Sequence, residues 1–147
     1  MTILPMKLLA VRAQRGAPSR RRDPLGPAGE RAAARVLRRR GYRVLARNLH
    51  TVAGEADLVC EAPDRRTIVL VEVKTRRRLD GQPQRSAEMA PEASVTAAKR
   101  RKLTAIARTL ARLNQWEDRP MRIDVVAVER RERRPRWSVR HIEDAVR

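Results

Sequence analysis

The sequence predicts a two-layer or three-layer α/β domain in which helices cover a mixed central sheet, with the element order α-β-β-β-α-β-β. The chain has 147 residues, of which 41% are hydrophobic, which suits one domain with one modest core. Two amphipathic stretches carry apolar residues at the helical period, and five short runs are rich in Val, Leu and Ile. The core must be aliphatic, because the chain contains no Phe, one Tyr and two Trp.

The first helix is predicted over residues 29–40. Small and apolar side chains recur there on one face, arginines occupy the other, and Gly41 follows as a stop signal. Upstream, residues 1–27 contain several prolines and three consecutive arginines but no sustained period. We therefore expect a basic, disordered arm over residues 1–27 and a folded domain over residues 28–147.

Five runs rich in β-branched and apolar residues predict strands. They cover residues 42–49, 54–61, 67–74, 121–129 and 137–142. The first three follow one another through short turns and predict a meander. The last two strands follow the second helix, and this order predicts a mixed central sheet covered by helices.

The second helix is predicted over residues 94–113, with Ser94 as its N-cap. Four apolar side chains at helical spacing form its expected buried stripe: Leu103, Ile106, Leu110 and Leu113. Before it, residues 75–93 contain Gly and Pro and no periodicity. That length is unusual for a simple connection and predicts a mobile functional loop.

Charge points to a polyanionic partner. The chain carries 35 Lys and Arg against 17 Asp and Glu, a net charge of +18. Such a potential attracts nucleic acid in a salt-dependent way, although an Arg-rich composition in a GC-rich genome would produce the same charge without any ligand. The shortage of aromatic residues argues against modules that stack bases on aromatic side chains.

Other features narrow the setting. No apolar run is long enough to span a bilayer, and the first residues lack a secretory apolar core, so we expect a soluble protein without a membrane partner. A single cysteine, Cys60, excludes an intramolecular disulfide and fits a reducing cytoplasm.

Two carboxylates interrupt the apolar strands of the meander. If strands 54–61 and 67–74 pair symmetrically about their turn, Asp57 lies opposite Glu72, and Glu55 lies opposite Lys74. Opposed carboxylates repel one another, and a divalent cation with a preference for hard oxygen ligands, Mg²⁺ or Mn²⁺, would turn that repulsion into binding. In the alternative reading, Glu55 and Lys74 form an ordinary cross-strand pair and Asp57 faces solvent.

These residues carry a family resemblance. The blocks GEADLV (54–59) and VEVKTR (71–76) resemble the PD-(D/E)xK motif of the restriction-endonuclease-like superfamily. Together with GERAAARVLRRRGYRVLARN (29–48), Lys99 and RIDVV (122–126), they are similar to the bacterial YraN-like uncharacterised family, which is related in pattern to archaeal Holliday junction resolvases. The resemblance covers about residues 28–145 and implies a restriction-endonuclease-like mixed sheet flanked by helices.

The resemblance also implies roles for individual residues. Asp57 and Glu72 would bind the metal together with the Val73 carbonyl, and Lys74 would orient the attacking water or stabilise the developing charge. Glu30 matches an additional acidic residue near the metal. An acidic residue in the first turn of a helix is equally explained by the helix dipole.

Several basic residues are candidates for phosphate contacts. They are Arg31, Arg47, Arg76, Arg77, Lys99 and Arg100. Lys99 and Arg100 begin the second helix, and Arg76 and Arg77 follow Lys74 closely. In the alternative reading they form solvated helix and strand surface.

The leading functional hypothesis is a metal-dependent endonuclease that uses Mg²⁺ or Mn²⁺ to cleave DNA phosphodiester bonds. By resemblance, branched or damaged DNA in recombination or repair is the favoured substrate. The second hypothesis is a non-catalytic nucleic-acid-binding protein with a nuclease-like fold, and a purely structural protein of biased composition ranks last. Resolvase-like proteins tend to act as dimers, so a homodimer is a further expectation from the resemblance.

Overall fold

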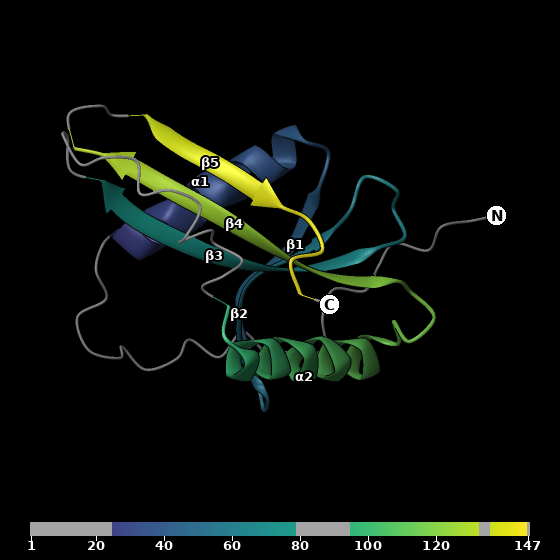
Figure 1. Cartoon of the computed structure of the whole chain (residues 1–147). Helices are drawn as coiled ribbons and strands as arrows, with labels where there is room; N and C mark the ends of the chain where they lie inside the picture. Colours follow the sequence, from purple (N-terminus) through teal and green to yellow (C-terminus); the bar gives the residue numbers. More distant parts are fainter. Residues whose placement is uncertain (1–24, 79–94, 133–135, 147) are drawn as a thin grey trace.

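A computed structural model describes residues 25–78, 95–132 and 136–146. Its centre is a mixed five-stranded sheet in the spatial order β1-β2-β3-β4-β5, with one long helix on each face (Figure 1). The order of elements along the chain is α-β-β-β-α-β-β, which confirms the predicted fold class. Most of the arm predicted over residues 1–27 and of the loop predicted over residues 75–93 lies outside the described residues.

Helix α1 (Leu25–Arg39) begins four residues before the predicted start. Pro27 lies in its first turn, where a proline is tolerated because the N–H groups have no intrahelical partner. The last residues of the predicted arm are therefore helical. Gly29 packs so closely on the Thr75 side chain that a Cβ at this position would clash with it. This contact brings the start of α1 onto the sheet.

Strands β1 (Arg43–Thr51), β2 (Gly54–Glu61) and β3 (Ile68–Arg78) form the predicted antiparallel meander. Leu58 pairs with Val71 and Glu61 with Ile68, which is the register expected from symmetry about the turn. The β2–β3 pairing ends at Leu58 and Val71. Beyond that point the two strands separate.

Strand β3 continues to Arg78, so residues 75–78 are strand rather than the expected loop. It pairs in parallel with β4 (Met121–Arg131) along its whole length, and β5 (Trp137–Ile142) pairs antiparallel with β4 at the edge. Parallel pairing requires a crossover, which here carries the second helix.

Helix α2 (Ala97–Asn114) is capped by Thr96, whose hydroxyl accepts a hydrogen bond from the Lys99 N–H, and not by the predicted Ser94, which lies outside the described residues. Leu103, Ile106 and Leu110 are buried as predicted. Leu113 is 48% exposed, so it does not belong to the buried stripe. At the C-cap, Gln115 adopts the left-handed conformation typical of helix ends.

The sheet separates two apolar clusters. On the α2 face, Leu103, Ile106 and Leu110 pack with Leu70 and Val125. The cluster on the α1 face has other members from α1, the meander and β4: Ala33, Leu37, Leu58, Val69, Val71 and Val126. Burial on both faces explains why β3 and β4 are nearly continuous apolar runs. Among the described helices, neither is long and apolar enough to cross a membrane.

Candidate functional site

The candidate site lies where β2 and β3 separate. Asp57 lies one residue before Leu58, the last β2 residue that pairs with β3, and its Oδ2 accepts a hydrogen bond from the Val73 N–H at 2.7 Å. The side chain thus bridges the gap between the strands in place of a backbone hydrogen bond. Asp57 and Glu72, predicted to be directly opposed, are close neighbours here but are not a ladder pair.

Glu72 is a buried carboxylate held by two lysines. The residue is 5% exposed, and its Oε1 lies 3.1 Å from Lys74 Nζ and 3.1 Å from Lys99 Nζ. Lys74 comes from the same strand two residues later, which places it on the same face. Lys99 comes from the first turns of α2, so the Thr96 cap that starts this helix also positions a cation at the site.

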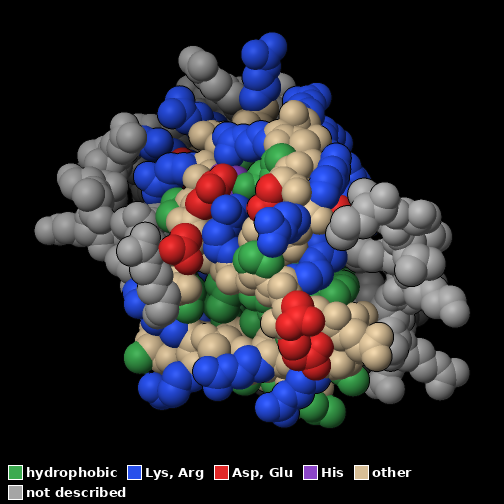
Figure 2. All heavy atoms as spheres, turned by 90° about the vertical axis from the view of Figure 1, so that its right-hand side faces the viewer, with side chains coloured by type: hydrophobic (Ala, Val, Ile, Leu, Met, Phe, Trp, Pro, Cys, Tyr) green, Lys and Arg blue, Asp and Glu red, His purple; other side chains and the backbone are tan. Residues whose placement is uncertain are grey.

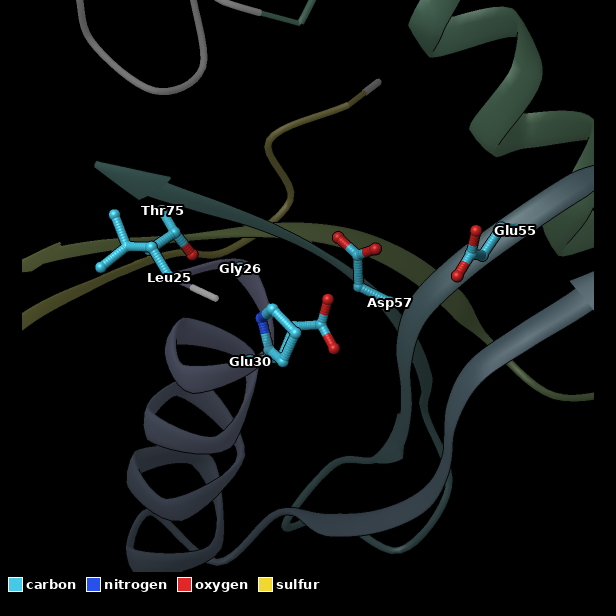
Figure 3. Close-up of a pocket in the computed structure, with 7 residues that line it drawn as sticks. Leu25, Gly26, Glu30, Glu55, Asp57 and Thr75 are labelled. Carbon is cyan, nitrogen blue, oxygen red and sulfur yellow. The ribbon is translucent and has the colours of Figure 1, made fainter. Parts of the chain in front are cut away.

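Helix α1 adds a third carboxylate. The carboxylates of Glu30 and Asp57 extend into one cavity of about 330 Å³, and Glu55 lies at its edge (Figure 3). The cavity is also lined by Leu25, Gly26, Pro27 and Thr75. Because α1 begins at Leu25, Glu30 does not lie in its first turn. The helix dipole therefore does not account for this acidic residue.

The electrostatics of Asp57 are unfavourable to its charge. The pKa of Asp57 is raised from its ordinary value to about 6, chiefly by burial and also by the neighbouring charges of Glu72 and, more weakly, Glu30. The hydrogen bond from the Val73 N–H and the charge of Lys99 act in the opposite direction but do not compensate. Asp57 is thus a carboxylate with too few positive partners.

The donor set can be compared with the needs of a metal ion. Among the described residues, no three His, Cys, Asp or Glu side chains converge closely enough to hold a metal as they stand. Asp57, Glu72 and the Val73 carbonyl nevertheless offer the hard oxygens that Mg²⁺ and Mn²⁺ prefer. A cation between the first two would relieve the repulsion that raises the pKa of Asp57. The residues present therefore fit a divalent cation.

The predicted phosphate contacts are divided among several surfaces. Lys99 reaches the site, and Arg100 is exposed in the same turns of α2. Arg76 shares a strand face with Glu72 and Lys74, whereas Arg77 shares the α1 side with Thr75.

The two remaining candidates, Arg31 and Arg47, lie elsewhere. Arg31 is exposed on α1 beside Glu30. Arg47 lies on β1, near enough to Cys60 to lower the pKa of that thiol, which burial raises overall to about 12. Lys and Arg side chains are spread widely over the face of the molecule in Figure 2, with carboxylates between them. Exposure alone therefore does not distinguish among the basic residues predicted to contact phosphate. Their position relative to Glu72 is the better criterion.

Sequence reasoning missed two parts of the site. Gly26 and Pro27 line the cavity but belong to the segment expected to be an arm. Thr75 falls in the predicted loop over residues 75–93, yet it forms the contact surface for Gly29. The signal for Thr75 was present, because it continues the alternation of the strand that carries Glu72 and Lys74.

Asp124 does not belong to the site. Its carboxylate lies 2.8 Å from Arg122 Nε and 2.9 Å from Arg122 Nη2, so it forms a structural ion pair. His141 Nε2 at 2.7 Å and the N–H of Asp144 at 2.9 Å complete its contacts.

Comparison with known proteins relates this geometry to a family. Residues 29–128 match the model of "Uncharacterised protein family UPF0102". A UPF0102 protein of Roseiflexus castenholzii is 46% identical over 127 residues, covering 86% of this chain and 95% of the relative. A UPF0102 protein of Symbiobacterium thermophilum is 48% identical, covering 71% of this chain and 81% of the relative. A UPF0102 protein of Pelobacter propionicus is 38% identical, covering 82% of this chain and 80% of the relative. The region matched by the family model contains most of α1, the meander, α2 and most of β4. The chain belongs to the UPF0102 family.

Proposed function

We propose that the protein is a metal-dependent endonuclease that hydrolyses phosphodiester bonds of DNA. The observation that carries this proposal is the meeting of Asp57, Glu72 and Lys74 at the separation of β2 and β3, beside a cavity. The arrangement agrees with the resemblance to the PD-(D/E)xK motif, in which two carboxylates and a lysine occupy these positions.

In this proposal Asp57, Glu72 and the Val73 carbonyl hold Mg²⁺ or Mn²⁺. The ion, when bound, supplies a Lewis acid and a lowered pKa for water. Lys74 stands beside Glu72 and would orient the attacking water or stabilise negative charge that develops on the phosphate. Glu30, across the cavity from Asp57, would accept a hydrogen bond from water on the α1 side.

Recognition of DNA would rely on the backbone. The chain carries a net charge of +18 and few aromatic residues, which favours phosphate contacts and shape over base stacking. Lys99, Arg100 and Arg76 are the best-placed candidates, because they lie on α2 and on the strand face of Glu72. Branched or damaged DNA is the substrate class that the resemblance favours, and a homodimer would present two sites to two strands.

One observation favours the second candidate function, a nucleic-acid-binding protein without catalysis. The same oxygen of Glu72 lies 3.1 Å from both Lys74 and Lys99, so a lysine must move before this oxygen can bind an ion. If Lys74 and Lys99 remain in place, they neutralise Glu72 and no cation binds there. The protein would then only bind DNA, through its basic surface.

Cleavage assays separate the two functions. Wild type, Glu72→Gln and Glu61→Gln would be incubated with linear, single-stranded, flapped and four-way-junction DNA in Mg²⁺, Mn²⁺ or EDTA. Glu61 is a matched control, since it is also a buried glutamate in the meander but pairs with Arg119 away from the site. The endonuclease proposal expects cleavage by wild type and Glu61→Gln, and none by Glu72→Gln or in EDTA. Binding without cleavage in every metal would favour the second candidate.

A matched pair of arginines tests the binding surface. Arg76→Ala should weaken DNA binding and flatten its salt dependence by roughly one counterion. Arg77→Ala removes the same charge from the opposite face of β3 and should change binding less. Equal effects of the two variants would argue for a diffuse charge effect instead of a defined path.

A further inference from the structure

Asn48 has two unusual properties. Its backbone φ is +46°, in the left-handed region that residues other than glycine seldom adopt, although it lies inside strand β1. Its Oδ1 is also the one buried side-chain polar atom without a hydrogen-bond partner among the described residues. A buried carbonyl oxygen without a donor is costly, so its retention calls for an explanation.

The strand register places Asn48 at the candidate site. Arg47 pairs with Leu58 and Leu49 with Ala56, so Asn48 lies opposite Asp57 between these two pairs. Directly opposed residues of an antiparallel pair have Cβ atoms about 4.5–5.5 Å apart. The register therefore makes Asn48, with its unpaired oxygen, a cross-strand neighbour of Asp57.

The backbone alone does not explain the choice of residue. Glycine would adopt a positive φ with less strain and would not bury an oxygen without a donor. Asparagine tolerates this conformation and adds a carbonyl oxygen. The amide oxygen of Asn48 must either accept a hydrogen bond from a donor outside the protein or lower the stability of the fold.

We propose that Asn48 is a positioning residue of the cation site, whose amide oxygen accepts a hydrogen bond from water held by the divalent cation at Asp57 and Glu72. This inference rests on the proposed function. Mg²⁺ and similar hard cations keep several of their waters in proteins, and those waters need acceptors from the surrounding shell. A neutral oxygen supplies one without adding to the repulsion among Glu30, Asp57 and Glu72.

Calorimetric titration of the full-length protein with Mn²⁺ tests the inference without an activity assay. Asn48→Gly keeps the left-handed backbone and removes the amide, and Asn48→Asp keeps an oxygen acceptor in the same place. Gln115→Gly is the matched control, because Gln115 also has a positive φ, +56°, but lies at the C-cap of α2. Melting in EDTA establishes that each variant is folded.

We expect Asn48→Gly to melt at or above the wild-type temperature in EDTA and to bind Mn²⁺ about tenfold or more weakly, the usual effect of losing such a partner. Asn48→Asp should bind at least as tightly as wild type, and Gln115→Gly should match it. Wild-type affinity in Asn48→Gly would overturn the role of Asn48 alone. Weakened binding in both Asn48 variants would show that an oxygen acceptor at this position is not what the cation requires, which would also overturn that role. No Mn²⁺ binding by wild type would overturn the cation site itself.

Discussion

Two aspartates of one sheet, Asp124 and the partly buried Asp57, have opposite environments. Asp124 on β4 is fully buried, and its contacts with His141, Arg122 and the Asp144 N–H lower its pKa despite the opposing effect of burial. Asp57 on β2 has one backbone hydrogen bond and two acidic neighbours, and its pKa is raised.

The difference teaches how to distinguish a structural carboxylate from a functional candidate. Arg122 also contacts the Tyr42 hydroxyl at 2.8 Å and Glu143 at 3.2 Å, so the Asp124 network ties β4 to the start of β1 and to the chain end. The protein itself supplies every partner that Asp124 needs. Asp57 lacks such partners and faces a cavity. Groups with strongly perturbed pKa values in clefts are enriched at functional sites.

The largest expected effect separates the two aspartates by activity. Under the proposed function, Asp57→Asn removes a cation ligand and should lower the cleavage rate by on the order of a thousandfold, about 4 kcal/mol in the barrier. Asp124→Asn should retain the wild-type rate at a temperature where it stays folded. Single-turnover cleavage of the preferred DNA measures both. A similar loss in the two variants would break the comparison.

Stability should show the reverse order. Asp124→Asn breaks a buried ion pair and is expected to cost about 3 kcal/mol of unfolding free energy. Asp57→Asn in EDTA removes a carboxylate that is repelled by its neighbours, so its stability should equal or exceed that of wild type. Urea unfolding at pH 7 provides the values. The interpretation of Asp57 is contradicted if its variant is the less stable of the two.

The pH dependence of stability sharpens the role of Asp124. Its folded pKa lies below the unfolded value of about 4, so its contribution is present above that pH and is lost as pH falls through the folded pKa. The stability difference between wild type and Asp124→Asn should therefore be largest near neutrality and shrink below about pH 4. Exposed Asp64, whose pKa is lowered to about 2 by its bonds to Thr67 and Arg66, titrates equally in both proteins and cancels.

The smallest expected effect is stabilisation by the cation. At a concentration ten times its dissociation constant, Mg²⁺ or Mn²⁺ should add about 1.4 kcal/mol to wild-type stability. The same addition should leave Asp57→Asn unchanged and should stabilise Asp124→Asn as much as wild type. Thermal melts with and without metal measure this, and an equal shift in all three proteins would indicate binding elsewhere.

Local pattern was enough to predict most of the fold. Alternation and turn residues gave the register of β2 and β3, because a symmetric turn leaves few other pairings. The predicted start of α1 is wrong because Pro27 suggests a helix break. A proline is also tolerated in the first turn of a helix, which is where Pro27 lies. The buried stripe was overextended to Leu113, because periodicity does not show where the covering sheet ends.

The sequence indicated several residues of the candidate site but not how they are arranged. Asp57, Glu72 and Lys74 stand out as charges in apolar strands, and alternation assigns them to faces. Alternation does not show where a ladder ends, so the bond from Val73 to Asp57 was not foreseen. The contact of Lys99 with Glu72 depends on how α2 crosses the sheet, which is a tertiary property.

The parallel pairing of β3 with β4 has a consequence for how the chain folds. The meander and α1 are local, but Ile68 meets Met121 only after the intervening crossover has closed, and such distant contacts slow folding. Until β4 arrives, the apolar edge of β3 is unpaired and open to other chains. A fragment that ends before Met121 would keep Asp57, Glu72 and Lys99 yet is expected to aggregate.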